Sequence, residues 1–186
     1  MPQGLGRKLT YSDLPEAPTD GKRYEIIRGR VYVTPSPRRA HQIISVRLER
    51  ALADYFEPRG MMMLHAPIDV ILTAEDIFVP DIVVFDPGAD DSERGIERPP
   101  LLIVEILSPS TRGRDLRLKH GRYGELGVEH YWIVDPREKS VTCFKLEGDT
   151  YLTRVRSISD RLLRHPDFDG MAIDVGMLWP RPRRNA

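Results

Sequence analysis

The sequence lacks the features that mark secreted and membrane-spanning proteins. It has one cysteine in 186 residues, Cys143, and can form neither an internal disulfide nor a cysteine-rich zinc site. No apolar run approaches the roughly 20 residues that cross a bilayer. The first ten residues carry Arg7 and Lys8 with no apolar segment behind them, unlike a secretory signal. We therefore expect a cytoplasmic protein without membrane association.

An excess of charge of either sign is also absent. The chain has 28 Lys and Arg against 28 Asp and Glu, and its formal net charge is zero. Any site for a polyanion must therefore be local, because no long-range attraction is available. One such concentration of basic side chains lies within eleven residues: Arg112, Arg114, Arg117, Lys119, His120 and Arg122. From this run alone, a solvated helix face and a phosphate-binding surface both remain open.

The features that are present are those of a folded chain of mixed secondary structure. The length and the hydrophobic fraction of 40% fit one domain spanning residues 1–186. Alternating and helical apolar patterns predict an α/β (α+β) fold with these elements: hairpins at 24–34 and 141–155, helices at 38–56 and 112–126, and strands at 62–65, 68–72, 79–85, 101–107 and 130–134.

Acidic residues inside apolar strands are the most informative feature. Glu105 lies within Leu101–Leu107, whose letters LLIVEIL are typical of a strand buried on both faces. Burying a carboxylate there costs several kcal/mol unless it is paired or coordinated. Asp81 begins a second apolar run, and two carboxylates on neighbouring strands can hold a divalent cation. A structural ion pair and a strand-end cap are the alternative interpretation.

Lys119 occupies a position in the predicted helix that faces the sheet. Helical spacing places it on one face with Leu116 and Tyr123, so it needs a partner among buried groups. One candidate is Asp115, four residues earlier. The other is the carboxylate pair, where an ammonium could stabilise charge that develops on a phosphoryl group.

These residues together resemble a large bacterial family of putative restriction endonucleases in the PD-(D/E)xK nuclease superfamily. The similarity rests on Val79-Pro80-Asp81, the run LLIVEILSPST from Leu101 to Thr111, and the later segment GVEHYWIVDP from Gly127 to Pro136. It extends upstream to RYEIIRG, residues 23–29, and to His41, and it covers nearly the whole chain.

The resemblance implies a restriction-endonuclease-like core, which is a central mixed β-sheet flanked by helices with extra β-hairpins. It implies Mg²⁺ or Mn²⁺ held by Asp81, Glu105 and the Ile106 carbonyl, with Glu25 as a further acid. Superfamily members carry a lysine two residues after the second acid. Here that residue is Leu107, and Lys119 matches the position at which this family carries its lysine.

The function that follows is metal-dependent hydrolysis of phosphodiester bonds in nucleic acid, with DNA as the expected substrate. Some of the four arginines on the helix that carries Lys119 could hold flanking phosphates: Arg112, Arg114, Arg117 and Arg122. His41 and Asp115 are further active-site candidates, although a buried histidine in a core is an equal alternative for His41.

Two rival functions and one assembly state remain to be tested. The protein could be a catalytically silent nuclease-fold module that acts in nucleic-acid binding or protein assembly, since fold does not fix function. It could also be a metal-dependent hydrolase of another substrate. A homodimer is expected from cleavage of two DNA strands and from aromatic residues predicted to be exposed, Phe144, Tyr151 and Trp179.

Overall fold

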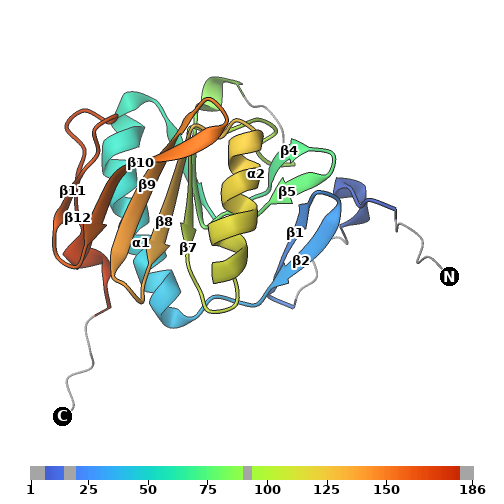
Figure 1. The fold of residues 1–186 in the computed structure, drawn as a ribbon, viewed down its shortest axis with the longest axis horizontal. Coiled ribbons are helices and arrows are strands. Elements are labelled where there is room, and N and C mark those ends of the chain that lie inside the picture. The colour runs from blue at the N-terminus through green and yellow to red at the C-terminus, as the bar shows by residue number, and fades with distance from the viewer. Residues whose placement is uncertain (1–6, 15–19, 90–93, 181–186) are drawn as a thin grey trace, which may run out of the picture.

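The chain forms two main sheets and a small hairpin, packed together with helices (Figure 1). The structure is a computed structural model that describes residues 7–14, 20–89 and 94–180. The strands are β1 (Arg23–Ile27), β2 (Arg30–Thr34), β3 (Met62–His65), β4 (Val70–Thr73), β5 (Asp76–Phe78), β6 (Ile82–Phe85), β7 (Leu102–Ile106), β8 (His130–Asp135), β9 (Ser140–Glu147), β10 (Thr150–Ile158), β11 (Leu162–Arg164) and β12 (Ala172–Asp174). The helices are α1 (Arg39–Phe56) and α2 (His120–Glu125), the latter preceded by a π-helical segment, Arg114–Lys119.

The central sheet is mixed, as the sequence predicts. Its six strands run in the order β10-β9-β8-β7-β6-β3. Only the β7–β8 pair is parallel, and the other pairs of this sheet are antiparallel. A parallel pair needs a long crossover connection, which the π-helical segment and α2 provide. Every residue of β7 is buried, which confirms the interpretation of the LLIVEIL run.

Helices cover both faces of this sheet. Ile44, Leu48 and Leu52 of α1 recur at helical spacing and are fully buried on one face. Tyr123 of α2 packs on the other face, in a cluster that includes Ile103 of β7. Because successive strand residues point to opposite faces, β7 contributes to both clusters.

The second sheet has the order β2-β1-β5-β4 and begins with the predicted hairpin. Its turn residues Arg28 and Gly29 have φ values of 53° and 73°, as in the two-residue turns that match strand twist. A Cβ atom on Gly29 would lie 2.6 Å from Lys8 Cβ, so this close approach requires glycine. Arg28 joins the hairpin to α2 through an ion pair with Glu125 at 2.6 Å.

Two predicted elements differ from the structure. The strand expected at 79–85 is shorter in the structure, because β6 begins only at Ile82, and a strand that was not expected, β5, ends just before it at Phe78. Pro80 lies at the junction, where its missing N–H interrupts no ladder. The helix expected at 112–126 is π-helical over Arg114–Lys119 and not α-helical throughout. The C-terminal hairpin of β11 and β12 includes a strand, β11, that the apolar pattern did not indicate.

The aromatic residues offered as an exposed interface lie in the core instead. Tyr151 and Trp179 are each 8% exposed, and Phe144 is half-buried. Tyr151 donates its hydroxyl proton to the Val128 carbonyl at 2.6 Å, and Trp179 Nε1 donates to the Ser159 carbonyl at 2.7 Å. The polar groups of Tyr151 and Trp179 thus form hydrogen bonds within the chain. The three aromatic side chains give no support to a homodimer.

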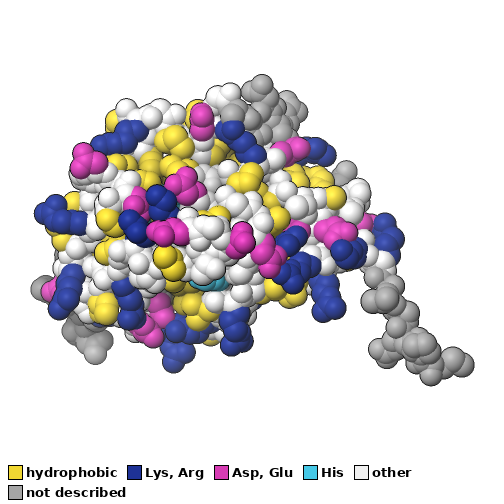
Figure 2. Space-filling model, turned by 45° about the horizontal axis from the view of Figure 1, so that its top comes forward, with side chains coloured by type: hydrophobic (Ala, Val, Ile, Leu, Met, Phe, Trp, Pro, Cys, Tyr) yellow, Lys and Arg dark blue, Asp and Glu magenta, His cyan; other side chains and the backbone are white. Residues whose placement is uncertain are grey.

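The surface reflects the neutral composition. Acidic and basic side chains intermingle on the face shown in Figure 2, with no large area of one sign. None of the helices in the described part of the chain is both long enough and apolar enough to span a bilayer.

Candidate active site

A cavity of about 400 Å³ collects most of the predicted site residues. Its walls come from β1, the N-terminal end of α1, the link between β5 and β6, the C-terminal end of β7 and the π-helical segment. The lining includes the predicted residues Glu25, His41, Asp81, Glu105, Ile106, Arg112, Arg114, Asp115 and Lys119. The structure thus brings together residues up to ninety-four positions apart, from Glu25 to Lys119.

Asp81 lies immediately before β6 and is 3% exposed. Its Oδ1 accepts a hydrogen bond from Arg23 Nη1 at 2.6 Å. Its Oδ2 accepts from the Ile106 backbone N–H at 2.7 Å and lies 3.1 Å from His41 Nε2. The carboxylate is therefore fixed by three donors from three different elements.

Glu105 projects from β7 on the face that α2 covers. Its Oε1 accepts from Lys119 Nζ at 2.7 Å and from the Tyr123 hydroxyl at 2.9 Å. Within the described ranges, its Oε2 accepts no hydrogen bond. One oxygen is thus held in place, while the other keeps its lone pairs available.

The Lys119 ammonium lies at the centre of a buried acidic group. It is 2.6 Å from Glu25 Oε1, 2.7 Å from Glu105 Oε1 and 3.8 Å from Asp115 Oδ1. Asp115 and Glu105 are thus both present as partners, as the sequence predicts, and Glu105 is the closer of the two. Asp81, the other member of the expected pair, contacts Arg23 and His41 instead, and Glu25 is the second close carboxylate. Glu25 is 1% exposed, and its Oε1 also accepts from the Val79 N–H at 3.0 Å.

The π-helical turns explain which side chains share the inward face with Lys119. The α-helical spacing predicts Leu116 on that face, yet Leu116 is 38% exposed. Asp115, Lys119 and Tyr123 are the buried residues instead. Because a π-helix has more residues per turn, it changes the angle between positions 116 and 119 relative to an α-helix.

Burial and charge move the pKa values of the two central acids in opposite directions. Burial raises the pKa of Asp81, but hydrogen bonds and charge attraction from His41 and Arg23 outweigh it and lower that pKa to about 2. Burial raises the pKa of Glu105, and Asp115, Asp81 and Glu25 add to this effect, while Lys119 opposes it. Burial lowers the pKa of Lys119, but attraction to Glu105, Glu25 and Asp115 outweighs burial, so the pKa lies above its usual value. Lys119 is therefore an ammonium at neutral pH.

The donor atoms fit a divalent cation of the Mg²⁺ type. Asp81 and Glu105 offer carboxylate oxygens, which are the ligands that such hard cations prefer. The low pKa of Asp81 keeps it ionised, and Glu105 Oε2 is free of competing donors among the described residues. Arg23 now neutralises Asp81, so a bound cation would compete with that guanidinium.

The four arginines predicted to bind phosphate fall into different positions. Arg112 and Arg114 line the cavity, but they pair with Asp135 at 2.5 Å and Glu25 at 3.2 Å, respectively. Arg117 is exposed, and Arg122 pairs with Asp76 at 2.6 Å; neither lines the cavity. The four arginines therefore do not form one surface: two line the cavity and two do not, and carboxylates of other elements hold three of them. Phosphate binding by any of them stays a prediction.

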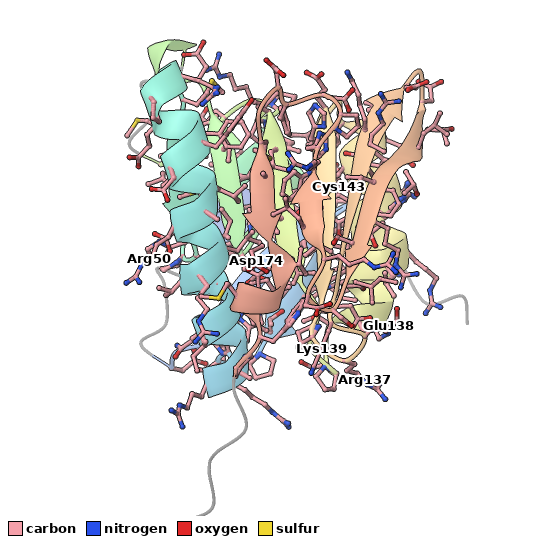
Figure 3. All side chains as sticks on the ribbon, turned by 90° about the vertical axis from the view of Figure 1, so that its left-hand side faces the viewer. Arg50, Arg137, Glu138, Lys139, Cys143 and Asp174 are labelled. Carbon is pink, nitrogen blue, oxygen red and sulfur yellow. The ribbon has the colours of Figure 1, made fainter. Side chains whose placement is uncertain are left out.

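Other cationic residues around the cavity were not singled out from the sequence. Arg23 contacts Asp81, and strand alternation with Glu25, two residues later in β1, could have indicated it. Arg38 and Arg137 are exposed residues of the cavity lining. Figure 3 shows Arg137 projecting from the turn between β8 and β9. No local sequence pattern joins these two positions, which lie ninety-nine residues apart.

Comparisons with known proteins agree with this architecture. The sequence model of the Uma2 family, described as "Putative restriction endonuclease", matches residues 10–176. The chain is 25% identical over 158 residues to the uncharacterized protein slr1290 of Synechocystis, with 83% of each chain covered. Its fold is similar to a crystal structure described as a putative nuclease belonging to DUF820 from Anabaena variabilis. That match has a TM-score of 0.71 and 21% identity, and it covers 90% of this chain and 94% of the other.

Proposed function

The chain belongs to the putative restriction endonuclease family, and on that premise we propose that its cavity hydrolyses phosphodiester bonds of nucleic acid, with DNA as the substrate. The observation that carries this proposal is the buried set of Asp81, Glu105 and Lys119 around one cavity. Carboxylates beside an ammonium suit phosphoryl chemistry, in which charge on the phosphate oxygens must be neutralised.

Asp81 and Glu105 would hold the cation, together with the Ile106 carbonyl, whose residue also lines the cavity. A bound Mg²⁺ or Mn²⁺ polarises a phosphate and lowers the pKa of an attacking water. The Ile106 N–H and His41 fix the orientation of Asp81 through their hydrogen bonds to Oδ2. Such partners of a ligand typically matter for cation affinity by about ten- to a hundredfold.

Lys119 supplies the positive charge that the superfamily normally places at the position of Leu107. Glu25 and Asp115 keep this ammonium charged and hold it beside Glu105. The exposed Arg38 and Arg137 at the cavity lining would contact the phosphates that flank the scissile bond. Arg112 and Arg114, which line the same cavity, stay predicted phosphate contacts beside them.

The test is incubation with duplex, single-stranded and structured DNA and RNA, in Mg²⁺ and in Mn²⁺. We expect cleavage of at least one DNA substrate, loss of cleavage on chelation of the cation, and a fall of at least about a hundredfold in Glu105→Gln. Activity that survives chelation and the Glu105→Gln change would contradict the proposal.

A catalytically silent module is the second candidate. The observation that favours it is that protein side chains already neutralise the acids, with Arg23 on Asp81 and Lys119 on Glu105. Such a module would bind nucleic acid without cleaving it in any cation.

We also propose that the protein is a homodimer, since two copies could each cleave one strand of a duplex. Sedimentation distinguishes this state from a monomer, because a homodimer has about twice the 21.3 kDa mass of one chain.

A further inference from the structure

A second group of ligand-type side chains lies on the other face of the central sheet from the cavity. His130 begins β8, and His165 and Asp167 follow β11. Along β8, His130 shares a face with Trp132, which belongs to the α1-side core. Glu105 is opposite Ile133 in the parallel register, so it points to the other face. The two groups are therefore separate sites.

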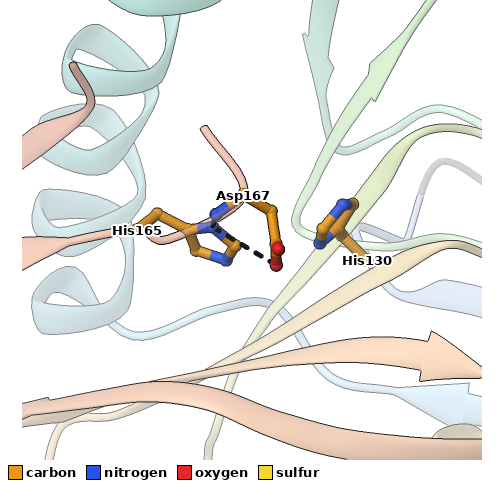
Figure 4. A group of neighbouring side chains, drawn as sticks. All are labelled: His130, His165 and Asp167. Atoms are coloured by element: carbon orange, nitrogen blue, oxygen red, sulfur yellow. Dashed lines mark hydrogen bonds and ion pairs between the residues drawn. The ribbon is translucent and has the colours of Figure 1, made fainter. Parts of the chain in front are cut away.

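The three side chains converge on one point. One ring nitrogen of each histidine and one oxygen of Asp167 all lie within 4.8 Å of one another (Figure 4). His165 Nδ1 and Asp167 Oδ2 are 3.9 Å apart. Tetrahedral ligands at about 2.0–2.2 Å from a zinc ion lie about 3.3–3.6 Å from each other, so a closure of about 1 Å would complete the geometry.

The histidines carry ring nitrogens that the protein leaves without partners. His130 is 2% exposed and His165 is 4% exposed. His130 Nε2 faces Glu129 Oε1 at 3.5 Å, and its buried Nδ1 has no hydrogen bond in the described part of the chain. If Nε2 carries the proton, Nδ1 is a bare lone pair. His165 Nδ1 accepts a bond of 3.2 Å from the Asp167 N–H, and its Nε2 is unpartnered among the same residues. A metal ion would bind Nδ1 in place of that N–H, or bind Nε2 after the ring proton moves to Nδ1.

The charges around the group are compatible with a cation. Asp167 accepts two hydrogen bonds from Arg154, at 2.9 and 2.8 Å, and lies 3.9 Å from Lys145. Glu129 and Glu147 contact these same two cations. Three carboxylates thus face two cations. A carboxylate has about four lone-pair directions, so Arg154 orients Asp167 without exhausting it.

We propose that His130, His165 and Asp167 bind a borderline transition-metal ion of the Zn²⁺ type, with water as the fourth ligand. Two imidazoles and one carboxylate favour such an ion over Mg²⁺, which prefers oxygen ligands alone. The ion fastens the segment after β11 to β8 of the central sheet.

The experiment is calorimetric titration of the full, chelator-treated chain with Zn²⁺. We expect one site per chain, and with Co²⁺ the visible absorption of a tetrahedral centre. Asp167→Asn should weaken binding at least tenfold, as should His165→Gln. Asp167 is the primary variant because its side chain is partly exposed, at 14%, and an asparagine retains its shape.

Three matched variants distinguish this site from other ligands. Asp169→Asn changes an exposed acid of the same loop, and His65→Gln changes an exposed histidine. Both should bind Zn²⁺ as the original chain does. Glu105→Gln, which changes the cavity, should also retain binding. The proposal is overturned if the original chain does not bind Zn²⁺, if Asp167→Asn binds as tightly as Asp169→Asn, or if only Glu105→Gln loses the ion.

Discussion

Lys119 and Arg23 are two cations that contact the acids of the cavity. The first affects the stability of the fold, and the second affects metal binding. Lys119 is 2% exposed and is surrounded by Glu25, Glu105 and Asp115. Arg23 holds one oxygen of Asp81. The first cation neutralises carboxylates that cannot reach water, whereas the second occupies an oxygen that a metal ion would need.

Loss of the Lys119 ammonium should destabilise the fold. Lys119→Ala leaves three buried acids without their central cation, and we expect the free energy of unfolding to fall by about 3–5 kcal/mol at neutral pH. Arg117→Ala, on the exposed side of the same π-helical segment, should change it by less than about 0.5 kcal/mol. Urea unfolding measures both values, and equal stabilities would show that the ammonium does not neutralise the cluster.

Removal of the Arg23 guanidinium should strengthen cation binding. In Arg23→Gln, Asp81 Oδ1 loses a charged competitor, so we expect the affinity for Mn²⁺ to rise about tenfold, equivalent to about 1.4 kcal/mol. Calorimetric titration gives the affinity, with Asp81→Asn as the variant that should lose binding. An unchanged or weaker affinity in Arg23→Gln would mean that the arginine supports the cation site.

Single residues could be predicted from the sequence where their chemistry conflicted with their surroundings. Glu105 within LLIVEIL needed compensation, and the structure supplies Lys119 and Tyr123. Arg23 was missed because an arginine near a strand end conflicts with nothing locally. The partner of Arg122 was not predicted, because Asp76 lies forty-six residues away.

At the scale of elements, Asp76 joins β5 to the hairpin and to α2. Its side chain is fully buried and accepts from the Arg28 N–H at 3.0 Å, from Thr73 Oγ1 at 2.7 Å and from Arg122 at 2.9 and 2.6 Å. Burial raises its pKa, but the bonds from Arg122, Thr73 and Arg28 outweigh burial and lower it. The position of β1, and hence of Glu25 and Arg23, depends in part on this junction.

The pH dependence of stability should report on Asp76. Because its folded pKa lies below the unfolded value of about 3.9, its contribution is present above pH 4 and is lost as the pH falls through the folded pKa. Asp76→Asn should cost about 3 kcal/mol at pH 7 and show a shallower loss between pH 4 and 2. Urea unfolding across this range tests both statements, and parallel curves for the two proteins would contradict them.

Elements with a clear apolar period could be predicted well, and the others could not. The spacing of Ile44, Leu48 and Leu52 identified α1, and Arg28-Gly29 identified the first hairpin turn. The π-helical turns before α2 were not predictable, since the pattern alone fits an α-helix. The late start of β6 reflects a tertiary requirement, because the segment from Val79 to Asp81 connects two different sheets.

At the scale of the whole molecule, a neutral chain must attract nucleic acid through local charge. Arg38 and Arg137 belong to elements far apart in sequence, yet both line the cavity. Arg50 lies on the outer side of α1 (Figure 3) and is exposed, as is Arg164. The two pairs carry the same charge, but only the first is at the proposed site.

The salt dependence of DNA binding should separate these two pairs. Arg38→Ala with Arg137→Ala should reduce the slope of log affinity against log salt concentration by about 2, since each phosphate contact contributes about one. Arg50→Ala with Arg164→Ala gives the same net charge and should leave the slope unchanged. Fluorescence anisotropy in a Glu105→Gln background measures binding without cleavage. Equal effects of the two pairs would locate the DNA elsewhere.

The most direct test of the proposed active site is cleavage by Asp81→Asn and Asp86→Asn under the same conditions. Asp81 directly precedes β6, and Asp86 directly follows it and is exposed. Asp86→Asn is therefore a matched acid-to-amide change outside the site. With saturating Mn²⁺ and a DNA substrate, we predict a fall of at least about a hundredfold in the cleavage rate of Asp81→Asn and an unchanged rate for Asp86→Asn. Equal rates in both variants and the original chain, or no cleavage by the original chain on any nucleic acid, would contradict the account.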